Sequence, residues 1–155
     1  MDPRTADKLH ELLTRLYGAH EELLAALHQQ QQAIRRFDAD GLEKLRDRCD
    51  AVAQRIAELE EARARLTGPG VRLSALVPTL GEPQRSRLAA ISAGLRKLAE
   101  EVASVGRVNA VAVHNMLNHF HTVYRLMAGA RSPAGYTAAG GAAAGGGALL
   151  IDAVA

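Results

Sequence analysis

The side chains of this chain that could hold a metal ion are six histidines and a single cysteine. Helical zinc sites commonly use two histidines four residues apart, because that spacing places both rings on one face. No two histidines here have it: His114 and His121 lie two turns apart, and His119 belongs to another face. No second cysteine or carboxylate cluster lies beside them in the sequence. The sequence therefore predicts no metal site and no cofactor.

The other reactive groups do not form a catalytic set. Cys49 lies on an apolar stripe, which favours a small core residue over a nucleophile, and one cysteine allows no intramolecular disulfide. Acidic pairs such as Glu21–Glu22 and Glu100–Glu101 are adjacent in sequence, whereas general acid–base catalysis needs groups that converge on one pocket. Phosphate-loop, dinucleotide-binding and nucleophile-elbow motifs are all missing from the sequence. We therefore expect no enzyme.

Charge and hydropathy exclude two further classes of partner. The net charge is only +2, and the arginines are interleaved with Asp and Glu, as on a solvated helix face. This favours a protein that binds no nucleic acid. No run approaches the roughly 20 apolar residues of a membrane span. The N-terminal residues lack the features of a secretory signal, so the expected location is the cytoplasm.

The composition predicts helices, since aromatic residues make up 3% of the chain and tryptophan is missing. A first helix is expected over residues 6–37, where polar His20 and Gln30 interrupt the apolar seam. A second is expected over 41–66, capped by Asp40 with Glu43 in an acidic capping box. Arg63 departs from its apolar heptad, and we expect its stem to pack while its head reaches water. The short break between these helices predicts an antiparallel hairpin.

The remaining elements are a connector, a long helix and a tail. Residues 71–80 are expected to form one or two helical turns that pack an apolar patch over the end of the hairpin. A third helix is expected over 83–128, and a flexible Gly/Ala-rich tail over 133–155. The predicted fold is therefore all-α, a three-helix antiparallel coiled-coil-like bundle made of a helical hairpin, a longer third helix and a short connector helix. Residues 1–132 would form the helical domain.

The C-terminal part of the third helix is the candidate binding surface. Between Val102 and Tyr124 the only formal charge is Arg107, and the apolar side chains spread around most of the helix. At 1.5 Å per residue the three helices would be roughly 48, 39 and 69 Å long, so the first two cannot cover the third. An exposed apolar surface of this size is typical of an interaction site. A binding module is thus the leading interpretation.

A leucine-rich first helix is followed by the Asp38–Leu45 break, the run Ile56–Glu60, and Asn109–Leu117 in a long last helix. In these features the chain resembles the FlgN family of flagellar type III export chaperones. An aromatic-plus-glycine tail begins near Tyr136. The chain departs from the family pattern at Gly106, where the first of two asparagines is expected.

This resemblance implies a cytoplasmic chaperone that binds C-terminal helical segments of the hook–filament junction (hook-associated) proteins. It would keep these subunits soluble and deliver them to the export apparatus, acting as a monomer or weak dimer. The last helix would then be the client-binding element, with Val105, Asn109, Ala112, Met116, Leu117, Phe120, Val123, Tyr124 and Met127 as the candidate contact residues.

The alternative is a structural coiled-coil protein that forms a homodimer through its third helix. The heptad that continues to Leu126 favours it, whereas Asn109 and His119 weaken the seam that such a dimer would use.

Overall fold

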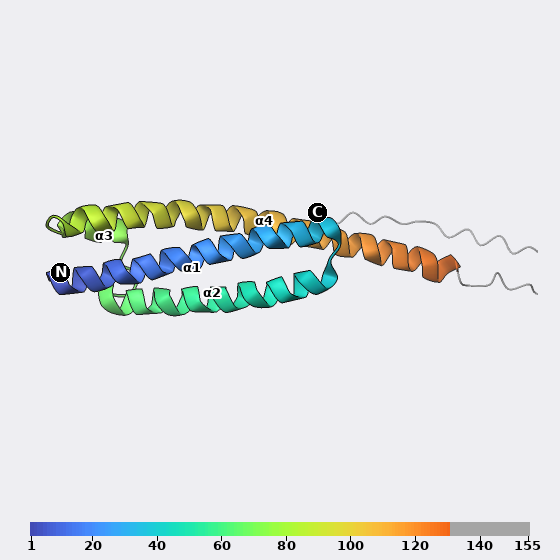
Figure 1. The fold of residues 1–155 in the computed structure, drawn as a ribbon, viewed down its shortest axis with the longest axis horizontal. Coiled ribbons are helices and arrows are strands. Elements are labelled where there is room, and N and C mark those ends of the chain that lie inside the picture. Colours follow the sequence, from blue (N-terminus) through green and yellow to red (C-terminus); the bar gives the residue numbers. More distant parts are fainter. Residues whose placement is uncertain (131–155) are drawn as a thin grey trace, which may run out of the picture. The chain divides into compact units, whose positions relative to one another are not determined.

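The computed structural model describes residues 1–130, and all elements within this range are helical (Figure 1). Three long helices are α1 (Pro3–Arg36), α2 (Ala39–Thr67) and α4 (Gln84–Ala130). Between α2 and α4 lie the short helix α3 (Leu73–Leu76) and the 3-10 helix η1 (Val77–Thr79). The predicted all-α class is confirmed. The predicted tail, residues 133–155, lies outside the described range.

The chain divides into two compact units, of which the first spans Met1–His119 and the second begins at Phe120. This boundary falls within α4. The first unit holds α1, α2, the connector and most of α4, and the core lies entirely within it. The two units are described separately below.

Helix capping explains where α1 and α2 begin. The Asp2 side chain caps α1 by accepting a hydrogen bond from the Thr5 amide at 3.0 Å. Asp38 caps α2 in the same way, accepting from the Gly41 amide at 2.9 Å. The predicted cap at Asp40 is therefore wrong, because α2 begins two residues earlier. Asp40 lies in the first turn instead, where its negative charge still favours the helix N-terminus.

Gly41 has a steric reason to be glycine. A Cβ atom built at this position would lie 2.2 Å from Asp38 Oδ2, the carboxylate that caps the helix. A larger residue here would push the cap aside. The Asp-Ala-Asp-Gly break is thus a hairpin turn in which Asp38 caps the helix and Gly41 leaves room for its carboxylate.

Polar contacts between α1 and α2 show that they are antiparallel neighbours. Arg55 forms an ion pair with Glu22, and Arg48 Nη1 donates to Gln29 Oε1 at 3.3 Å. The later residue of α1 contacts the earlier residue of α2, so the two helices run in opposite directions. Figure 1 shows their ribbons side by side. Both predicted helices therefore meet in the expected hairpin.

The core centres on one end of this hairpin. Leu9, Leu13 and Leu16 of α1 are fully buried together with Leu88 of α4. Leu73, Leu76 and Val77 of the connector pack against this cluster, and Leu80 is buried within it. The prediction that the connector packs an apolar patch over the hairpin end is confirmed.

Within the first unit, α4 lies along α1 and runs in the same direction. Near its start, a Cβ built on Gly94 would lie 3.2 Å from the ring of Tyr17. A larger residue at position 94 would therefore press on the tyrosine ring. Further along the helix, the Asn109 side chain reaches the Leu27 carbonyl oxygen of α1.

Candidate interaction surface

The structure separates the predicted α4 residues of the first unit by burial. Val105, Ala112 and Met116 are half-buried, whereas the Leu117 side chain is 58% exposed. Asn109 is only 2% exposed, which makes it the most buried of the predicted contact residues. The sequence pattern therefore groups side chains that play different roles in the folded chain.

Asn109 is bound inside the protein. Its Nδ2 donates to the Leu27 carbonyl oxygen at 2.8 Å and to Gln30 Oε1 at 2.9 Å. Its Oδ1 is buried and has no partner among the described residues. Two of the polar residues that interrupt the apolar seams, Gln30 and Asn109, are thus joined by a hydrogen bond between α1 and α4.

A groove of about 490 Å³ lies beside Asn109, and we call it the apolar groove. One wall belongs to α4, through Val113, Met116 and Leu117. The other belongs to the first turns of α2, through Ala39 and Leu42, with charged Glu43 and Arg46 also lining it. The α2 wall was missed from the sequence. Leu42 lies in the apolar heptad of the second helix, and nothing in that spacing indicates a groove.

The second unit supplies the remaining predicted residues. Phe120, Val123, Tyr124 and Met127 recur at helical spacing on α4, and all four are exposed, Tyr124 most of all at 71%. Leu126, which was not predicted, is 70% exposed. Large apolar side chains outside the prediction are also exposed in the first unit, at Val108, Val111 and Phe37.

Exposure therefore continues over a long part of α4. Every residue from Leu117 to Gly129 is exposed. The expectation that the C-terminal part of the longest helix remains exposed is met by these residues in the described part of the chain. Apolar side chains held on the outside of a helix are suited to contacting another protein.

The comparisons with known proteins identify the family. Residues 1–144 match the family model described as FlgN protein. This chain belongs to the FlgN family. No significant match was found among curated proteins or among solved structures. The family assignment thus rests on a match that includes all the described residues.

FlgN-family membership fixes the general role of the chain. The family consists of chaperones for flagellar type III export, so this protein is a flagellar export chaperone. It is a family of chaperones and not of enzymes. The pairing of α1 with α2 also fits the coiled-coil character predicted from the sequence.

Three further observations concern possible chemistry and membrane insertion in this FlgN-family chain. Cys49 is a free thiol on α2 whose pKa is raised, chiefly by burial and then by the negative charge of Asp50. A raised pKa leaves less of the reactive thiolate near neutral pH. Within residues 1–130, no three His, Cys, Asp or Glu side chains gather closely enough to hold a metal ion. None of the helices in the same range is long and apolar enough to cross a membrane.

Proposed function

We propose that the protein binds C-terminal helical segments of hook–filament junction proteins in the cytoplasm. By covering their apolar faces it keeps these subunits soluble, and it then delivers them to the export apparatus. The client-binding element is α4. The observation that carries this proposal is the run of exposed apolar side chains on α4, in a chain of the FlgN family.

The exposed side chains have the chemistry of interface anchors. Phe120 and Tyr124 are large rings that would lose much water-exposed surface on binding, and such residues often dominate interface energetics. Met116 and Leu117 line the apolar groove, where an amphipathic client helix could insert one side chain per turn. Asn109 would act indirectly, because its bonds to α1 hold the α4 wall of the groove in place.

The arrangement of the helices supports this assignment. We infer that α1, α2 and the first-unit part of α4 form one three-helix bundle, with α4 parallel to α1 and antiparallel to α2. In this bundle the core lies near Leu13 and Leu88, and the apolar groove lies beside the α1–α2 turn. Substitutions in the groove would therefore leave the core intact.

The test is calorimetric titration with the C-terminal helical segment of a hook-associated subunit. Replacing Met116, Leu117, Phe120 and Val123 by Gln should abolish binding while helix content and melting temperature remain nearly unchanged. The matched control replaces Val108 and Val111 by Gln, since these exposed apolar residues lie on other faces of the same helix. Wild-type affinity in the quadruple variant, or its unfolding, would show that these residues are not the client site.

The second candidate function is a structural homodimer through α4. The heptad that continues to Leu126 favours it. The burial of Asn109 against α1 argues against it, because this seam position is already occupied within one chain. Sedimentation of the purified protein separates the two: a stable dimer that the quadruple variant disrupts would support the structural function.

A further inference from the structure

A second hollow, of about 420 Å³, lies on the first unit away from the apolar groove. Its walls are the end of α2, the chain from Gly70 to Ser74, the first half of α4, and His20 of α1. We call it the arginine hollow, because Arg63, Arg72 and Arg96 all line it. Its volume lies within the range of about 300–1,000 Å³ that is common for ligand sites.

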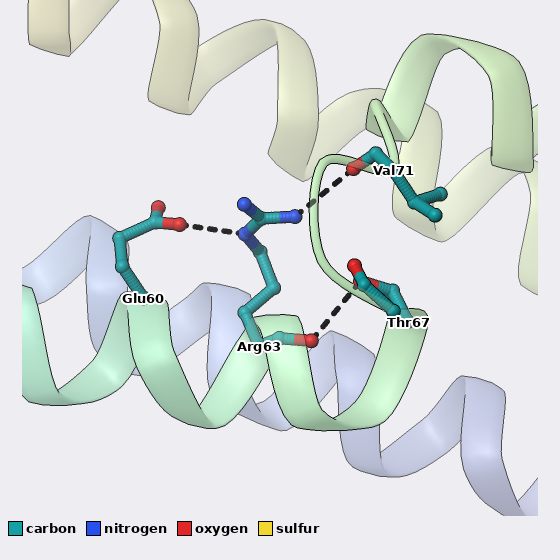
Figure 2. Close-up of polar contacts among 5 residues, drawn as sticks. Glu60, Arg63, Thr67 and Val71 are labelled. Atoms are coloured by element: carbon teal, nitrogen blue, oxygen red, sulfur yellow. Dashed lines mark hydrogen bonds and ion pairs between the residues drawn. The ribbon is translucent and has the colours of Figure 1, made fainter.

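Arg63 lines this hollow. Figure 2 shows the polar contacts that hold its side chain in place. Its Nε donates to Glu60 Oε2 at 2.6 Å, and its Nη1 donates to the Val71 carbonyl oxygen at 3.3 Å. The Thr67 hydroxyl donates to the Arg63 carbonyl oxygen at 3.0 Å one turn later. The side chain is only 20% exposed. The low exposure fits the predicted packing of the stem, and the two hydrogen bonds of the guanidinium also tie α2 to the connector.

The other two arginines have no such role. Arg72 and Arg96 are exposed, and neither guanidinium forms an ion pair or hydrogen bond with a side chain or carbonyl of the described residues. Glu60 is the only carboxylate lining the hollow, and Arg63 already uses it. The hollow therefore has two arginines whose charges no lining residue compensates, and it is electrostatically suited to an anionic ligand.

The remaining lining residues indicate what kind of anion fits. Leu73 and Leu95 also line the hollow and add apolar surface to it, which a small inorganic anion would not use. The Ser92 hydroxyl also lines the hollow, and its oxygen is buried without a partner among the described residues. A ligand that combines carboxylates with aliphatic groups would contact the arginines, the leucines and the Ser92 hydroxyl.

We propose that the arginine hollow binds an acidic, leucine-containing peptide segment of a second partner protein. Two carboxylates of the segment pair with Arg72 and Arg96, and an aliphatic side chain between them packs on Leu73 and Leu95. Arginine–carboxylate pairs are charge-assisted and frequently bidentate, so they give orientation as well as affinity. This site is separate from the apolar groove, and the chaperone could therefore hold a client and a second protein together.

The experiment uses the full-length protein and a short, capped, fluorescent peptide of leucine and glutamate, followed by fluorescence anisotropy. The wild-type protein should bind this peptide and should bind a version with glutamine in place of glutamate at least about tenfold more weakly. Replacing both Arg72→Gln and Arg96→Gln should weaken binding of the acidic peptide by about tenfold or more, since both charge-assisted contacts with its carboxylates are lost. Both arginines are exposed, so this variant should fold normally.

The matched control carries Arg35→Gln and Arg107→Gln, which remove the same charge from exposed positions outside the hollow. Its affinity for the acidic peptide should remain within about twofold of wild type. An equal loss in this control, or full displacement of the peptide by an equal concentration of inorganic phosphate, would overturn the proposal. So would competition between the peptide and the client segment. Client titration of the Arg72/Arg96 variant tests the groove independently, and its affinity should not change.

Discussion

Asn109 on α4 and Gln30 on α1 are joined by a hydrogen bond of 2.9 Å between Nδ2 and Oε1. The two residues interrupt the apolar seams of helices that are far apart in sequence, and the same Nδ2 also donates to the Leu27 carbonyl oxygen. A polar pair on an otherwise apolar seam costs stability but favours one register, because any slip would leave both groups unsatisfied. It therefore sets where α4 lies along the hairpin, next to the apolar groove.

Replacing Asn109 by Asp should destabilise the protein by about 2–5 kcal/mol. The new carboxylate would face the Leu27 carbonyl and Gln30 Oε1 with no donor from its own side chain, in a position that is almost fully buried. Urea denaturation measures the change. Asn115→Asp is the control, because Asn115 is exposed on the same helix and should change stability by less than about 0.5 kcal/mol. Equal effects at the two positions would contradict this account of the seam.

Replacing Val52 by Asp should unfold the hairpin or destabilise it by several kcal/mol. Val52 is 3% exposed, and an unpaired charge at such a position has a large desolvation cost. Far-ultraviolet circular dichroism during thermal unfolding provides the measurement. Gln54→Asp, at an exposed position on the same helix, serves as the control and should retain the wild-type transition.

The Glu22–Arg55 pair predicts a pH dependence of stability. The hydrogen bond from Arg55 lowers the pKa of Glu22 below its ordinary value of 4.5. A carboxylate with a lowered pKa in the folded state stabilises the fold above its ordinary pKa, and this contribution disappears as the pH falls through the lowered value. The stability difference between wild type and Glu22→Gln should therefore be constant near neutral pH and shrink in acid. A difference that grows as the pH falls would contradict the assignment. Because both side chains are exposed, the effect should be small.

The α2 wall of the apolar groove predicts that Leu42 contributes to client binding. Leu42→Gln should weaken binding of the hook-associated segment by about threefold to tenfold, since it removes roughly 1 kcal/mol or more of apolar contact. Leu42 is half-buried and belongs to no part of the core cluster, so the melting temperature should change little. Calorimetric titration measures the affinity. Unchanged affinity would confine the client site to α4.

Deletion of all residues from Pro133 onward should leave thermal stability nearly unchanged. Among the described residues, the buried core lies between Ala6 and Asn109. The Gly/Ala-rich stretch that would be deleted has no periodic apolar face to pack on it. Differential scanning calorimetry of the truncated protein tests this. A large fall in melting temperature would show that Leu149 and its neighbours contribute to the fold.

The amino-acid sequence by itself determined which segments are helical and that α1 and α2 run antiparallel. Leucines at spacings of three and four mark the buried faces of α1 and α2, and glycine and proline mark the ends of the helices. Both signals act within a few residues, so they can be recognised in the sequence alone. Local signals alone predicted the wrong cap, Asp40 in place of Asp38. Asp38 and Asp40 are both suitable caps, and the helix begins at whichever one fits the turn that joins α2 to α1.

Only the tertiary structure decided which side chains of α4 face inward. Asn109 was grouped with Met116 and Phe120 by periodicity, yet it bonds to α1 while Phe120 is exposed. In the same way, Arg63 bonds to the connector, and Leu42 joins α4 residues in a groove. A helical pattern gives the direction of a side chain about its own axis but not the neighbour that lies there. That neighbour depends on contacts between residues far apart in the chain, which the spacing of residues along one helix does not contain.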